Sequence, residues 1–175
     1  MKNSKILMSF FILVVLFFPA SSFAEPQDTS GWGKTKWGMT KEQLEGIYGS
    51  ELDSLSKEKE YSNTYCDKIL NNYKIIGYDF TVEFCFLNST DKLNKINIVR
   101  RGSDSGVVFH HLQKSLIEKY GMPSKEFVDM SLGKRIARVW ILPSTIIQLN
   151  ENRIFSIGLH SVNLEYNERR LNDDL

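Results

Sequence analysis

The sequence predicts an α+β fold built from two successive units, each a helix followed by an antiparallel meander. Three observations support this prediction. Residues 37–49 carry start and stop signals for a short helix, residues 80–87 alternate between apolar and other side chains, and a second helix-then-strands pattern begins near residue 105. The expected element order is α-β-β-β-α-β-β-β, with both helices packed on one face of the antiparallel sheet.

The first helix is expected to begin directly after Thr40. This residue is a favoured N-cap, and Gln43 stands where its side chain can complete a capping box. Met39 and Leu44 occupy the two positions of a hydrophobic staple, and Gly49 provides a left-handed stop. Because so short a helix is unstable alone in water, we expect it to lie against the rest of the fold.

A strand pattern follows a polar connection. Residues 50–62 are polar and charged, and we favour a second short helix there over a mobile loop. Phe80, Val82, Phe84 and Phe86 then alternate with less apolar residues, as in a strand with one buried face. A turn at residues 88–91 leads into a further strand at 93–101, so we expect an antiparallel meander in the middle of the chain.

The second unit repeats this order. A helix is predicted from Ser105 to Tyr120, ended by Gly121 and Pro123. Strands are predicted at 136–142, 145–149 and 154–164. Both helices end in Tyr-Gly, which together with the matching order indicates an internal duplication. The predicted units are residues 37–102 and 103–175, joined in a single compact unit.

The chain begins with the pattern of a secretory signal over residues 1–24. Lys2 and Lys5 form a basic start, residues 6–18 are almost continuously apolar, and residues 22–24 form a small-x-small cleavage site. The alternative is a retained membrane anchor, but the apolar run is shorter than the roughly 20 residues that a span needs. Residues 25–36 are then expected to form a flexible lead-in.

Charge and composition limit the classes of function. Without Lys2 and Lys5, 20 basic residues face 21 acidic ones, so the expected mature chain has a formal charge of −1. This balance gives no electrostatic footprint for nucleic acid. The 42% hydrophobic and 12% aromatic content is that of a folded protein.

Several short stretches resemble a known family. Gly38 to Leu44 (GMTKEQL), Tyr120 to Pro123 (YGMP), Arg138 to Trp140 (RVW) and Ile146 to Ile154 (IIQLNENRI) resemble the helix-then-strands pattern of the SmpA/OmlA, or BamE-like, envelope proteins. Their arrangement in tandem is similar to the repeat of the β-lactamase inhibitor protein. The resemblance implies an α+β repeat that acts through protein contacts in the cell envelope, with no catalytic residues. The chain lacks the acylated cysteine of the lipoproteins.

The two cysteines, Cys66 and Cys85, are predicted to form a structural disulfide, because exported proteins favour paired cysteines. One geometric objection stands against it. A hairpin turning at Gly77 and Tyr78 would place Cys85 opposite Leu70, leaving Cys66 roughly 13 Å further along at about 3.3 Å per residue. Since bridged Cα atoms lie within about 7 Å, the bond requires the chain near Tyr65 to fold back, or a different turn.

The sequence carries no recognisable catalytic or metal-binding pattern. His110, His111 and His160 are not spaced to chelate one ion, and a structural role is favoured for each. No nucleophile motif or phosphate-binding loop occurs. We therefore predict no enzyme activity, no metal and no cofactor.

Aromatic side chains are the remaining candidates for a binding site. Trp32, Tyr78 and Tyr166 are predicted contacts for an unidentified envelope protein that docks on a sheet face or an edge strand. The expected function is a non-catalytic, periplasmic protein-binding or envelope-maintenance module. The rival is a binder of a small apolar ligand, such as a lipid or cell-wall fragment, in a cavity beside Phe80, Phe84 and Phe109.

Overall fold

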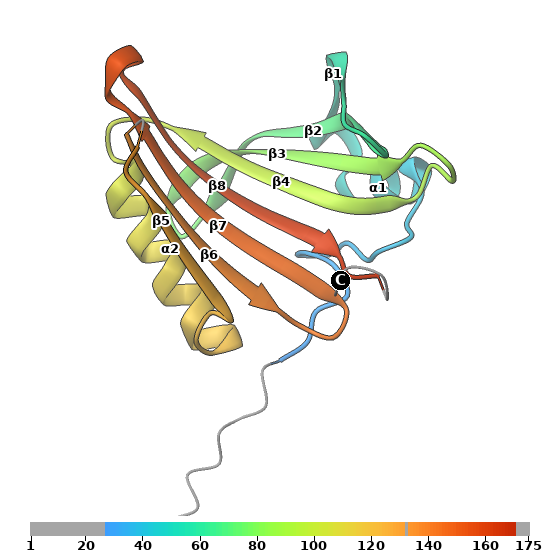
Figure 1. Cartoon of the computed structure of the whole chain (residues 1–175). Coiled ribbons are helices and arrows are strands. Elements are labelled where there is room, and N and C mark those ends of the chain that lie inside the picture. The colour runs from blue at the N-terminus through green and yellow to red at the C-terminus, as the bar shows by residue number, and fades with distance from the viewer. Residues whose placement is uncertain (1–26, 132, 171–175) are drawn as a thin grey trace, which may run out of the picture.

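The computed structural model describes residues 27–131 and 133–170, and the predicted signal segment lies outside them (Figure 1). The described helices and strands are α1 (Lys41–Tyr48), β1 (Leu52–Glu60), β2 (Thr64–Ile75), β3 (Tyr78–Leu87), β4 (Leu93–Arg101), α2 (Ser105–Tyr120), β5 (Lys125–Asp129), β6 (Lys134–Ile141), β7 (Thr145–Ile154) and β8 (Leu159–Glu168). Short 3₁₀ turns follow α1 and β7, at Gly49–Glu51 and Phe155–Ile157.

All eight of these strands form one antiparallel sheet, in the order β1-β2-β3-β4-β8-β7-β6-β5. The pairing of β4 with β8 makes the sheet continuous across its middle, with Ile98 opposite Leu164. Figure 1 shows the strands side by side as a twisted layer, with β1 and β5 at its two edges.

The predicted fold class is wrong. The structure is a sheet-dominated fold with one eight-stranded antiparallel sheet and two short helices, rather than two repeats of a helix and a three-stranded meander. The prediction missed the edge strands β1 and β5. Their residues are almost all exposed, so neither strand has the buried alternate positions from which a strand is predicted. The segment at 50–62, for which a short helix was favoured, is mostly β1.

The start of α1 follows from its capping residues. The amide of Gln43 donates to Thr40 Oγ1 at 3.3 Å, and the amide of Thr40 donates to Gln43 Oε1 at 2.9 Å, so the predicted capping box is confirmed. Leu44 is fully buried, and the amide of Gly49 closes the last turn on Glu45. The box fixes where the helix begins, and Leu44 holds it on the sheet.

We expect Thr40→Ala to lower the free energy of unfolding by about 1 kcal/mol, because the substitution leaves the amide of Gln43 without its acceptor. Urea unfolding followed by circular dichroism measures this change. Thr40→Ser, which keeps the hydroxyl, is the matched control and should remain near the wild-type value. Equal losses for the two variants would contradict the capping explanation.

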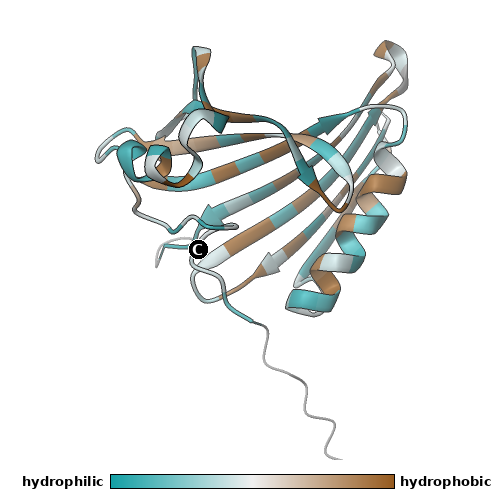
Figure 2. Ribbon diagram, turned by 180° about the vertical axis from the view of Figure 1, so that it is seen from behind, coloured by the Kyte–Doolittle hydropathy of each residue, from teal (hydrophilic) through white to brown (hydrophobic). Residues whose placement is uncertain are grey.

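The core lies between the sheet and the helices, both of which cover the same face (Figure 2). From α2, one apolar side packs inward, as the spacing of Phe109, Leu112, Leu116 and Tyr120 predicts. These side chains meet the alternate residues of β3, β4, β7 and β8, including Phe84. The opposite face of the sheet is therefore left to polar and mixed side chains.

Residues 27–36, the described part of the expected lead-in, are attached to the turn between β6 and β7. Asp28 accepts hydrogen bonds from the amide of Ser144 at 3.0 Å and from its hydroxyl at 2.6 Å. Thr145 Oγ1 donates to the carbonyl of Thr29 and accepts from Trp37 Nε1, the latter at 2.8 Å. This segment thus connects the start of the described chain with the second half of the sheet.

Candidate functional site

The candidate site is the face of the sheet that points away from the helices, here called the open face. Successive side chains of a strand point to opposite faces. Because Phe80, Val82 and Phe84 point to the helices, Thr81 and Glu83 belong to the open face. The strand registers extend this face with Lys95, Asn97, Val99, Arg101, Asn163, Glu165, Gln148, Asn150, Arg135, Ala137, Phe127 and Asp129. In Figure 1 the helices lie behind the sheet, so this face is turned to the viewer.

The open face has a first half, formed by β1 to β4, and a second half, formed by β5 to β8. A buried carboxylate lies near the middle of the first half. Glu83 is 3% exposed, accepts a hydrogen bond from Asn97 Nδ2 at 3.0 Å and is paired with Lys59 Nζ. Because a buried charge is costly unless it is paired, both partners hold this side chain in one position. The carboxylate therefore forms a fixed part of the floor of the face.

The polar network continues into the second half of the sheet. Lys95 Nζ lies 2.7 Å from Glu165 Oε2, and Asn163 Nδ2 donates to Glu165 Oε1 at 2.7 Å. Two buried acceptors on this floor, Asn97 Oδ1 and Asn163 Oδ1, receive no hydrogen bond from any described residue.

A hollow of about 510 Å³ lies over the first half of this face. It is lined by Lys59, Tyr61, Thr81, Glu83, Asn97, Val99 and Arg101. Within the described residues, Arg101 has no carboxylate partner, whereas Lys59 is paired with Glu83. Tyr61 is 45% exposed, and Lys95 Nζ lies 5.4 Å from the centre of its ring. The hollow thus combines an available guanidinium with an exposed aromatic ring.

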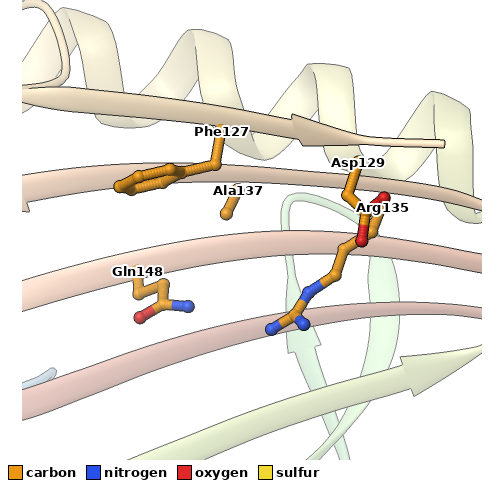
Figure 3. A pocket seen from close by; sticks show the side chains of 5 residues that line it. All are labelled: Phe127, Asp129, Arg135, Ala137 and Gln148. Atoms are coloured by element: carbon orange, nitrogen blue, oxygen red, sulfur yellow. The ribbon is translucent and has the colours of Figure 1, made fainter. Parts of the chain in front are cut away.

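A second hollow, of about 290 Å³, lies over the other half, where β5, β6 and β7 meet (Figure 3). It is lined by Phe127, Asp129, Arg135, Ala137 and Gln148. The amide of Ser131 donates to Asp129 at 2.9 Å and holds the pKa of that carboxyl below its ordinary value. Asp129 is therefore an anion at neutral pH. The open face offers hollows in both of its halves, each with charged groups and an aromatic ring.

The predicted disulfide between Cys66 and Cys85 is confirmed, with the two Cα atoms 3.9 Å apart. Both cysteines are fully buried and connect β2 to β3 on the side of the open face. The geometric objection assumed a turn at Gly77 and Tyr78. The turn instead has Ile76 and Gly77 as its two central residues, with φ of 46° and 85°, as a type I′ hairpin requires.

Two irregularities in β2 account for the rest of the difference between the expected and the observed partner of Cys85. The register with β3 changes between Leu70 and Tyr73, and again between Cys66 and Lys68. Each change adds one residue to β2 relative to its partner, as a β-bulge does. Together with the earlier turn, the bulges bring Cys66 directly opposite Cys85.

The structure separates the three predicted contact residues. Trp32 is half-buried, and the centre of its ring lies 5.3 Å from that of Tyr73. The hydroxyl oxygen of Tyr78 lies 3.0 Å from Nδ1 of His111 in α2. Tyr166 is only 5% exposed, and burial beside Tyr120 raises the pKa of its hydroxyl. None of the three lines either hollow of the open face, and Tyr166 is a core residue.

Sequence reasoning missed the exposed aromatic residues of the open face, Tyr61 and Phe127. Tyr61 follows the edge strand β1, and Phe127 lies in the edge strand β5, where no buried pattern indicates which face a side chain occupies. A usable signal was present: Phe127 and Val128 are adjacent apolar residues in a short polar stretch, which is unusual for a surface strand unless it contacts something.

Residues 27–131 and 133–170 contain no group of three or more histidine, cysteine, aspartate or glutamate side chains placed to hold a metal ion. In the same ranges, no helix has the length and apolar character needed to cross a membrane.

Comparisons with known proteins give little further guidance. No family model matches the chain, and no solved structure matches it significantly. The chain is similar to the ATP synthase gamma chain of Ruthia magnifica subsp. Calyptogena magnifica, with 27% identity over 100 residues that cover 53% of this chain and 34% of that protein. The chain thus spans about a third of the length of that relative. This partial similarity shows no family for the chain and does not bear on the resemblance to BamE-like proteins.

Proposed function

We propose that the protein is an exported, non-catalytic docking module that binds a folded protein partner on its open face. The observation that carries this proposal is the polar floor of that face, where Glu83 and Glu165 are each held by two side chains. A layer this ordered is suited to recognition, because its side chains lose little conformational freedom on binding.

The larger hollow indicates the chemistry of the partner. Its lining contains two cationic side chains, Lys59 and Arg101, and one carboxylate, Glu83. The charge of Glu83 is already neutralised by its ion pair with Lys59. Arg101 is thus available to pair with a carboxylate of the partner, since a guanidinium recognises a carboxylate through two parallel hydrogen bonds. Tyr61 would pack against an apolar part of the same partner surface, as tyrosines commonly do in interfaces.

Export is part of the proposal. The Cys66–Cys85 disulfide is compatible with an oxidising compartment. We propose that the protein is periplasmic. The predicted signal segment would direct its export, and the envelope proteins that it resembles act in that compartment.

The rival binder of a small apolar ligand has less support. Phe80, Phe84 and Phe109 are each at most 2% exposed and pack within one continuous core. None of the three lines any hollow described above. A tightly filled core of this kind leaves these rings in contact with one another and with their protein neighbours.

The test is capture from an envelope extract with wild-type protein and with the double variant Tyr61→Ala/Arg101→Glu. We expect a stoichiometric protein partner to be retained by the wild type and lost by the variant, with at least a tenfold fall in affinity, because a hot-spot aromatic residue and an ion pair are removed together. Titration calorimetry with the identified partner measures the change.

Lys114→Glu is the matched control, since Lys114 lies on the exposed side of α2 and its side chain is 78% exposed. It should retain the partner at wild-type affinity. A partner that both variants bind equally, or recovery of a lipid or glycan without any protein, would refute docking on the open face.

A further inference from the structure

The two edges of the sheet differ in how well they are protected from pairing with another strand. The β1 edge carries consecutive charges at residues 57–60, and its register with β2 is interrupted between Ser54 and Lys59. Charges and irregular pairing both discourage a further strand from adding to an edge. The other edge, β5, also carries charges, at Lys125, Glu126 and Asp129, but it differs from β1 in being paired regularly along all five of its residues.

Apolar side chains are exposed along the β5 edge. Of the eight large hydrophobic side chains that are exposed in the described residues, four lie between residues 122 and 130. These are Met122, Phe127, Val128 and Met130. A regularly paired edge strand with exposed apolar residues is a template for pairing with another strand. Figure 1 shows β5 as the outermost strand of this half of the sheet.

The sequence of β5, Lys-Glu-Phe-Val-Asp, is complementary to itself in an antiparallel pair. If two copies place Phe127 opposite Phe127, then Lys125 lies opposite Asp129 in both directions and Glu126 lies opposite Val128. Cross-strand aromatic pairs and opposite charges each stabilise a sheet. Moving the register by two residues one way sets Glu126 opposite Glu126, and the other way sets Phe127 opposite Asp129, so the Phe127-centred register is favoured.

We propose that the protein forms a homodimer through its β5 edge, with Phe127 on the two-fold axis and two symmetric Lys125–Asp129 ion pairs. The two eight-stranded sheets then form one continuous sheet, with both open faces on the same side. This goes beyond docking on the open face and does not depend on it. A five-residue strand pair is a small contact, so we expect a dissociation constant on the order of 10 to 100 μM.

The sharpest test is cysteine cross-linking at the proposed axis. Because the sequence has only two cysteines, both in the buried disulfide, Phe127→Cys adds a single free thiol. Directly opposite residues have Cα atoms about 4.5–5.5 Å apart, within the range of a disulfide. Phe127→Cys should therefore convert to a covalent dimer under mild oxidation. Glu126→Cys, the matched control, should form no covalent dimer, because its two copies are not opposite each other.

Sedimentation velocity tests the ion pairs without adding cysteines. Lys125→Glu places one carboxylate opposite Asp129 in each of the two symmetric pairs and should weaken the dimer about tenfold. Lys57→Glu makes the same charge change on the β1 edge and should leave the dimer unchanged. A monomer at every concentration up to about 1 mM, equal cross-linking at positions 126 and 127, or cross-linking of Phe127→Cys only to a different protein would overturn the proposal.

The two proposals fail separately. Loss of dimerisation in Lys125→Glu leaves Tyr61 and Arg101 untouched at the other end of the open face. If Lys125→Glu is monomeric and still binds the partner, the result supports both dimerisation through β5 and docking on the open face.

Discussion

Replacing both cysteines, as in Cys66→Ala/Cys85→Ala, is expected to lower the free energy of unfolding by about 3 kcal/mol. The bond closes a loop with a sequence separation of 19 residues, and its removal returns the corresponding chain entropy to the unfolded state. For a domain of this size, the loss corresponds to a fall in melting temperature of roughly 6–12 °C. Differential scanning calorimetry of the two proteins measures it.

Reductant provides the control for the disulfide prediction. When the wild type is unfolded in dithiothreitol, its melting temperature should fall toward that of the double variant. The melting temperature of the variant itself should not change with dithiothreitol. Both cysteines are fully buried, so we expect reduction to follow unfolding and not to occur in the folded protein. A variant as stable as the oxidised wild type would show that the bond contributes no stability.

Sequence reasoning succeeded where the local chemistry dictates the structure. The Thr40–Gln43 capping box and the apolar side of the second helix are properties of residues three or four positions apart, and both are as predicted. The alternation at Phe80, Val82 and Phe84 identified the buried face of β3 in the same way. Local spacing was enough because each pattern is satisfied within one element.

The fold class could not be obtained by the same means. The edge strands β1 and β5 have no buried face, so their sequences look like connections. The turn was predicted at Gly77 and Tyr78, because a β-branched residue such as Ile76 rarely adopts the positive φ that it has here. The bulges in β2 depend on pairing with β3, and no local signal marks them.

The candidate site was missed for a related reason. A polar residue such as Asn97 or Glu165 at an alternate strand position normally faces water and needs no explanation. Only the register of β3, β4, β8 and β7 shows that these side chains come together on one face. Attention to tryptophan and tyrosine selected Tyr166, which is a core residue, and overlooked Tyr61.

Replacing Trp140 is expected to have the largest effect on stability. This side chain of β6 is 1% exposed, and its Nε1 donates to the carbonyl of Gly121, the C-cap of α2, at 2.8 Å. Trp140→Ala removes the ring from the core and should cost about 4 kcal/mol. Trp140→Phe keeps most of the apolar contact but leaves the Gly121 carbonyl unpaired, so we expect a loss of about 2 kcal/mol.

Trp37→Phe is the matched control for this prediction. Trp37 also donates through Nε1, to Thr145 Oγ1 at 2.8 Å, but its side chain is only half-buried. Its replacement by phenylalanine should therefore lower the free energy of unfolding by only about 1 kcal/mol. Urea unfolding orders the three variants, and hydrogen exchange locates the effect. In Trp140→Phe, protection should fall first in the last turn of α2, because the link between Gly121 and β6 is lost. Equal costs for Trp140→Phe and Trp37→Phe, or uniform loss of protection, would show that this hydrogen bond does not fix the end of the helix.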